Sequence, residues 1–125
     1  MRRSIVETLE PRQLFAATTL PNMVGQFSGS VTFNNGTTDT EILVVTVQNK
    51  GSFSGQVFQG SGVTSATRGT VNKKGVIHTT THGINVKFSS KFVGVVNGDN
   101  IAGSFVTKQG KLKLPGIVSL TRTAI

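Results

Sequence analysis

Residues 84–96 read INVKFSSKFVGVV, and within them apolar and polar side chains alternate more regularly than elsewhere in the chain. One parity carries Ile84, Val86, Phe88 and Phe92, and the other carries Asn85, Lys87, Ser89 and Lys91. Successive side chains of a β-strand point to opposite faces, so this period of two predicts a half-buried strand. We therefore expect both phenylalanines to point into a core and both lysines to point into solvent.

The rest of the body repeats this pattern in shorter runs that turn residues separate. Asn34-Asn35-Gly36 and Asn97-Gly98-Asp99-Asn100 contain residues that tolerate the positive φ angles of tight turns. Because the runs follow one another with short connections, the simplest topology is an antiparallel up-and-down meander. The predicted strands cover residues 26–33, 40–48, 52–58, 62–71, 76–82, 84–96, 101–107 and 111–121.

Glycines at inward positions favour closure of this meander into a barrel. The motif Phe-Ser-Gly-x-Val occurs at residues 27–31 and 53–57, with glycine at the middle inward position. Such a glycine lets a sheet coil tightly and leaves room for a neighbouring phenylalanine. Closure also removes exposed sheet edges. We predict an all-β fold, a small antiparallel up-and-down barrel of about eight strands, with a two-sheet β-sandwich as the alternative.

The chain divides by composition at Gly25 into a leader, residues 1–24, and a single barrel domain, residues 25–125. Charged residues and Pro11 interrupt the apolar residues of the leader, so it lacks the continuous apolar core of a secretory signal peptide. No run approaches the roughly 18 apolar residues of a transmembrane helix either. We expect a short flexible or partly helical segment with Ile5 and Leu9 on one face, ending at Pro11.

Residues 9–15 read LEPRQLF and follow an Arg2-Arg3 pair. With these residues the start of the leader, residues 1–17, resembles the LEPR-XLL segment that opens many large surface or exported bacterial proteins. Glu7 matches that pattern, and Phe15 stands in place of its last leucine. The sorting motif that the resemblance implies consists of Leu9, Glu10, Pro11, Arg12, Leu14 and Phe15. What it implies for function is contact with export or sorting machinery and an exported or envelope-associated location in a bacterium. It implies no activity.

Two predicted strands start with the pattern Gly-x-Phe, at Gly25-Gln26-Phe27 and Gly51-Ser52-Phe53. Through these strand starts the body is weakly similar, in architecture only, to the calycin-like barrels, which include avidins and lipocalins. Avidin-type sites stack tryptophans on their ligand, and this chain contains no Trp, so no binding residue is carried over. A barrel of this size is either filled by its own side chains or holds one small ligand.

Residues that could carry catalysis are sparse. Asp39 and Glu41 are interpreted as a polar flank of a turn rather than as a catalytic pair. His78 and His82 fall four apart in a threonine-rich run, and on a strand their rings lie about 13 Å apart, too far for one metal ion. We predict no catalytic residue, no metal site and no cofactor, and we do not expect an enzyme.

Two sets of side chains are candidates for binding. One set points into the barrel, where a small apolar ligand would fit if the inward glycines leave a cavity; it consists of Phe27, Phe53, Phe88, Phe92 and Phe105. The other set would contact an anionic polymer, in keeping with the formal net charge of +8. It consists of Lys87, Lys91, Lys111 and Lys113. Strand parity separates these lysines from the phenylalanines, which argues against sequence-specific nucleic-acid binding.

The sequence favours a non-catalytic, exported or envelope-associated β-barrel module with a structural or binding role. One alternative is a calycin-like carrier of a small apolar ligand, and the other is a polyanion-binding surface module. A cavity inside the barrel would favour the carrier, and a filled interior would favour a scaffold.

Overall fold

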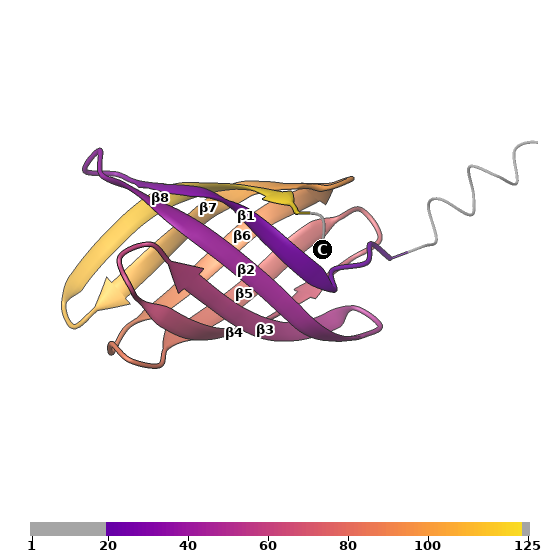
Figure 1. Cartoon of the computed structure of the whole chain (residues 1–125), viewed down its shortest axis with the longest axis horizontal. Coiled ribbons are helices and arrows are strands. Elements are labelled where there is room, and N and C mark those ends of the chain that lie inside the picture. The colour runs from indigo at the N-terminus through magenta and orange to yellow at the C-terminus, as the bar shows by residue number, and fades with distance from the viewer. Residues whose placement is uncertain (1–19, 124–125) are drawn as a thin grey trace, which may run out of the picture.

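The protein is a closed antiparallel barrel (Figure 1). Its structure, a computed structural model, describes residues 20–123. The strands are β1 Gly25–Phe33, β2 Thr38–Asn49, β3 Ser52–Gln59, β4 Thr64–Val71, β5 Val76–Gly83, β6 Ser89–Asn97, β7 Asn100–Gln109 and β8 Leu112–Arg122. Each strand pairs with its neighbours in chain order, so the predicted up-and-down barrel is confirmed and the sandwich is excluded. The sorting motif, residues 9–15, lies outside the described residues, and the division at Gly25 stays a prediction.

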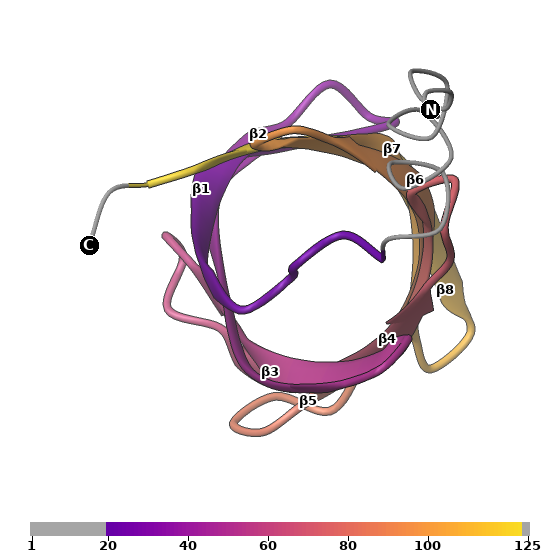
Figure 2. The ribbon, with the colours of Figure 1, turned by 90° about the vertical axis from the view of Figure 1, so that its right-hand side faces the viewer.

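Closure depends on the pairing of the first strand with the last. In the β1–β8 ladder Phe27 lies opposite Arg122, and Val31 lies opposite Val118. On its other side β1 pairs with β2, where Leu43 is the partner of Phe27. The sheet therefore forms a continuous ring when it is viewed along its axis (Figure 2). Each of the eight strands has two hydrogen-bonded neighbours, which removes the exposed edge of an open sheet.

The predicted strand 84–96 is wrong in its first third. Residues 84–88 form a loop, and β6 begins at Ser89. Ile84, expected in the core, is 58% exposed. The Asn85 side chain holds this loop against the β3–β4 turn, because its Oδ1 accepts the amide of Thr64 at 3.0 Å and its Nδ2 donates to the carbonyl of Gly62 at 2.9 Å. These contacts between distant segments compete with strand pairing, and local alternation does not reveal them.

Inward side chains divide the barrel along its axis. Near the end where β1 begins, which we call the closed end, the buried set is Met23, Phe27, Val45, Phe53, Val71, Ile77, Val96, Ile101 and Leu120. Further along, Gly94 and Gly103 pair across β6 and β7. A Cβ added at Gly103 would lie 2.8 Å from Cζ of Phe92, so this glycine pair leaves the space that the ring occupies.

The closed end is covered by residues 20–24, which we call the plug. Met23 has no exposed surface and belongs to the core. Its amide donates to Oε1 of Gln48 at 2.6 Å, and Nε2 of the same glutamine donates to the carbonyl of Pro21 at 3.0 Å. In Figure 2 the indigo segment before β1 crosses the ring. Within residues 20–123, no helix is long and apolar enough to span a membrane.

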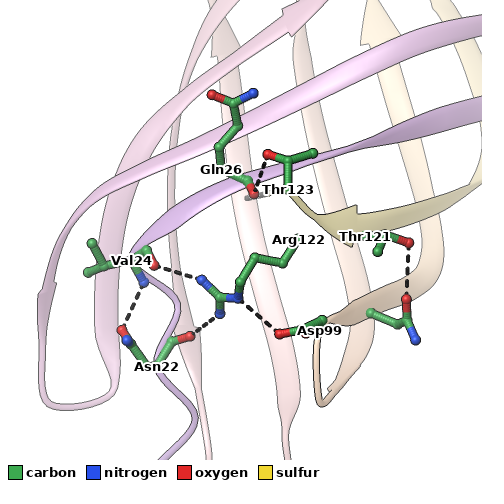
Figure 3. A network of polar contacts seen from close by, with 8 residues as sticks. Asn22, Val24, Gln26, Asp99, Thr121, Arg122 and Thr123 are labelled. Atoms are coloured by element: carbon green, nitrogen blue, oxygen red, sulfur yellow. Dashed lines mark hydrogen bonds and ion pairs between the residues drawn. The ribbon is translucent and has the colours of Figure 1, made fainter. Parts of the chain in front are cut away.

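Arg122, at the end of β8, holds the plug from the other side (Figure 3). Its Nη1 donates to the carbonyl of Val24 at 2.8 Å, and its Nη2 donates to the carbonyl of Asn22 at 2.6 Å. The Nε atom lies 3.3 Å from Oδ1 of Asp99, and the guanidinium carbon lies 4.4 Å from the centre of the Phe27 ring. One planar cation thus ties the plug, the β6–β7 turn and the core together.

Candidate ligand-binding cavity

The barrel interior contains a partly open cavity of about 70 Å³. Its lining includes the buried Met23 of the plug and the partly exposed Gln59, Ser90 and Thr107 near the opposite end. We call that opposite end the open rim; it consists of the connections 34–37, 60–63, 84–88 and 110–111. The cavity therefore has a floor at the closed end and a mouth at the open rim.

The floor and the middle of the cavity are apolar. Leu43, Val57, Val118 and Leu120 contribute aliphatic surface. Phe105 meets the ring of Phe33 edge to face, with 5.5 Å between ring centres and an angle of 85° between ring planes. Because these side chains occupy every second position along their strands, the period of two in the sequence accounts for this half of the cavity.

The mouth is polar over six consecutive strands. From β2 to β7, the inward residues nearest the open rim that line the cavity are Glu41, Gln59, Ser65, Thr81, Ser90 and Thr107. The corresponding stretches of β1 and β8 instead carry Val31, Phe33 and Leu114. The interior is thus amphipathic along the barrel axis, apolar toward the closed end and polar toward the open rim.

Four hydroxyl residues of the cavity lining form a line across the sheet, which we call the hydroxyl row: Thr67, Thr81, Ser90 and Thr107. In the ladders Thr67 is opposite Thr81, Thr81 is opposite Ser90, and Ser90 is opposite Thr107. Thr81 Oγ1 donates to Thr67 Oγ1 at 2.9 Å, and Thr107 Oγ1 donates to Ser90 Oγ at 3.2 Å. A hydroxyl both donates and accepts, so this row can meet either kind of polar group on a ligand.

Glu41 is the ionisable side chain among the residues that line the cavity. Gln59 lies directly opposite it in the β2–β3 ladder, and Gln59 Nε2 lies 3.4 Å from Glu41 Oε1. Burial raises the pKa of Glu41 above its ordinary value of 4.5, the Gln59 contact lowers it, and the charge of Asp39 adds to the rise. Glu41 therefore faces the cavity rather than flanking a turn in solvent, which corrects its interpretation from the sequence.

The predicted interior phenylalanines all point inward, but only four of the five line the cavity. Phe53, Phe88, Phe92 and Phe105 contribute to its wall. Phe27 is fully buried at the closed end under the Arg122 guanidinium, away from the cavity lining. Whether any of them contacts a ligand stays a prediction.

The four lysines of the predicted polyanion set occupy two kinds of position. Lys91 and Lys113 lie on the outer faces of β6 and β8, whereas Lys87 and Lys111 lie in two connections of the open rim. All four are exposed. His78 and His82 also point outward from β5 and are exposed, as expected for a strand. Within residues 20–123, no three His, Cys, Asp or Glu side chains are grouped so that they could hold a metal ion.

The polar residues of the mouth were missed at the sequence level, although a signal for them was present. Glu41, Gln59 and Thr107 each lie two positions along their strand from a buried apolar residue, Leu43, Val57 and Phe105 respectively. They therefore point to the same, inward face of the sheet. A polar residue on the inward parity of a barrel strand marks the interior just as strictly.

Neither a family model nor a curated protein matches the chain. Solved structures match it across most of its length. EF1p2_mFAP2b bound to DFHBI has a TM-score of 0.69 at 10% identity, covering 81% of this chain and 94% of that one. The redesigned β-barrel mFAP1 bound to DFHBI has a TM-score of 0.63 at 13% identity, covering 80% and 94%. The bradavidin2–biotin complex has a TM-score of 0.58 at 15% identity, covering 76% and 95%.

At these identities the likeness concerns the fold. The chain has an eight-stranded barrel fold like theirs, and the three similar structures are described as bound to DFHBI or as a complex with biotin. This chain shares with them the closed antiparallel sheet around a central axis.

Proposed function

We propose that this protein is a non-catalytic binding barrel whose cavity takes one small amphipathic ligand. The observation that carries the proposal is the axial division of the interior, with an apolar floor below the arc of polar side chains at the mouth. A purely structural barrel needs no such arc, because apolar side chains would fill its interior at lower cost. The similar barrels that are complexed with DFHBI and biotin add support.

The size of the cavity bounds the ligand. Its volume of about 70 Å³ exceeds the ~10–15 Å³ that a single water requires but is below the ~150 Å³ of an apolar cavity that takes benzene. A compact apolar group therefore enters the floor, and the rest of the ligand extends into the mouth. There the hydroxyl row and Gln59 offer donors and acceptors, which favours a ligand with a polar head over the small apolar ligand of the alternative drawn from the sequence.

Native mass spectrometry of the full chain tests this function. We expect the protein as purified to carry a small-molecule adduct, or to gain one from a set of short amphipathic compounds. Thr107→Leu should abolish the adduct because it fills the mouth and removes the contact with Ser90. Ser104→Leu, on the outer face of the same strand, is the matched control and should retain it. A wild type that binds nothing, or equal binding by the two variants, would contradict the proposal.

We further propose an exported or envelope-associated location, with residues 1–24 as the sorting segment. Support comes from the resemblance of residues 1–17 to LEPR-XLL segments. Fusion of residues 1–24 to a fluorescent reporter, followed by fractionation of bacterial cells, checks it. The reporter should leave the cytoplasmic fraction, and Pro11→Ala with Arg12→Ala should return it there. An unchanged cytoplasmic signal with the intact segment would refute the sorting role.

A further inference from the structure

The open rim combines exposed apolar side chains with positive charge. Ile84 and Val86 in the β5–β6 connection are 58% and 37% exposed, and Leu112, beside the β7–β8 turn, is 59% exposed. These two connections are neighbours on the rim because β6 pairs with β7, with Ser89 opposite Lys108. Large apolar side chains in one loop and beside the neighbouring turn remain in water only at a free-energy cost, so they indicate a partner.

Four lysines surround these apolar tips: Lys87, Lys108, Lys111 and Lys113. Lys108 and Lys113 lie directly opposite each other on the outer face of the β7–β8 ladder. Like charges in that arrangement repel each other. Among the described residues, the ion pair found is Arg122 with Asp99, at the closed end. The nearest carboxylates of the rim, Asp39 and Glu41, belong to β2 on another part of the ring.

We propose that the open rim docks on an anionic lipid bilayer, with Ile84, Val86 and Leu112 in the headgroup region and the four lysines against lipid phosphates. Basic residues flanking short apolar side chains are the combination that peripheral proteins use at such surfaces. The surface includes Lys87, Lys111 and Lys113 of the predicted polyanion set, but the apolar tips favour lipid. A nucleic acid or an acidic polysaccharide would gain nothing from Ile84 and Leu112.

The two ends of the barrel differ in this respect. The turns at the closed end, residues 50–51, 72–75 and 98–99, include Lys50, Lys73 and Lys74 but no large apolar side chain. The exposed apolar residues near that end, Val24 at 41% and Val47 at 58%, lie in the plug and on β2. Docking through the open rim would turn the mouth of the cavity toward the bilayer, from which a ligand with an apolar end could enter directly. The docking surface itself does not depend on the cavity being occupied.

Sedimentation of the full chain with vesicles tests this surface. We expect binding to vesicles of phosphatidylglycerol mixed with phosphatidylcholine and little binding to phosphatidylcholine alone. Lys111→Gln with Lys113→Gln should weaken the binding roughly 25-fold, about fivefold for each lysine. Lys73→Gln with Lys74→Gln removes the same charge at the closed end and should change it less than about twofold. Equal losses in the two double variants would overturn a rim-specific surface.

The apolar tips distinguish lipid from other polyanions. Ile84→Ser with Leu112→Ser should reduce vesicle binding about tenfold or more and leave retention on heparin unchanged. Val47→Ser is the control, because Val47 is 58% exposed on β2 toward the closed end. Heparin retention without vesicle binding would overturn the proposal in favour of a polyanion surface, and an absence of both would overturn it outright. The cavity variant Thr107→Leu should still bind vesicles. Vesicle binding therefore tests the docking surface independently of whether the cavity binds a ligand.

Discussion

Single residues of the cavity have properties that depend on which way each strand faces. Glu41 and Gln59 lie side by side at the mouth because β2 and β3 pair in a register that places them opposite each other. A carboxyl group facing a partly enclosed space loses hydration, and its charged form is disfavoured. Burial is accordingly the main cause of the raised pKa of Glu41. The same residue on the outward parity would have remained an ordinary surface acid.

Glu41→Gln should change how stability depends on pH. Because the native pKa of Glu41 is raised, the native state binds a proton that the unfolded state releases, so wild-type stability falls as pH rises from about 4.5 through the raised pKa. Glutamine has no such titration. Urea denaturation should show that the free energy of unfolding of the variant rises relative to that of the wild type as the pH rises across this window. Circular dichroism is the readout because the chain has no Trp or Tyr. A pH-independent difference would contradict the burial of the carboxyl group.

At the scale of elements, the plug and the loop 84–88 show how connections complete a barrel that the strands only outline. Met23 fills the closed end although it belongs to no strand. Asn85 fixes the loop that carries Phe88 to the cavity wall. Both elements are held by side chains that bond backbone groups far away in the sequence. Contacts of that kind pair backbone groups at places where no strand ladder continues to pair them.

Arg122→Gln should loosen the plug. The variant loses the charged donors to the carbonyls of Asn22 and Val24, and the ion pair with Asp99. We expect a loss of about 1–3 kcal/mol in the free energy of unfolding, with faster hydrogen exchange at the amide of Met23. Arg68→Gln, an exposed arginine on the outer face of β4, is the control and should leave both unchanged. Unaltered exchange in Arg122→Gln would show that the plug does not depend on this side chain.

At the scale of the whole molecule, the two ends of the barrel differ in structure. One end is sealed by the plug and by Arg122, and the other presents the cavity mouth, the apolar tips and four lysines. A closed sheet accounts for this polarity, because the connections of an up-and-down barrel alternate between its two ends. Residues from four separate connections thereby meet at one rim. Binding in the cavity and docking at the rim are independent proposals that share this geometry.

The sequence predicted the eight strands and most of their boundaries. It also predicted the inward orientation of Phe53, Phe92 and Phe105, because alternation is a property of each strand by itself. Its failure at Ile84 and Val86 has a physical reason: a loop can keep the alternation of a strand when Asn85 binds a distant turn. The polar mouth was missed for a different reason. Glu41, Gln59 and Ser90 acquire a shared role only when their strands are placed side by side.

What the sequence by itself determined is therefore local: the period of two that sorts side chains to two faces, and the glycine and asparagine turns that reverse the chain. Only the tertiary structure decided that β1 pairs with β8, that Met23 seals one end, and that the hydroxyl row lines the other. These features join residues as far apart as Asn22 and Arg122. Such contacts depend on how the whole sheet curls, which no stretch of sequence specifies alone.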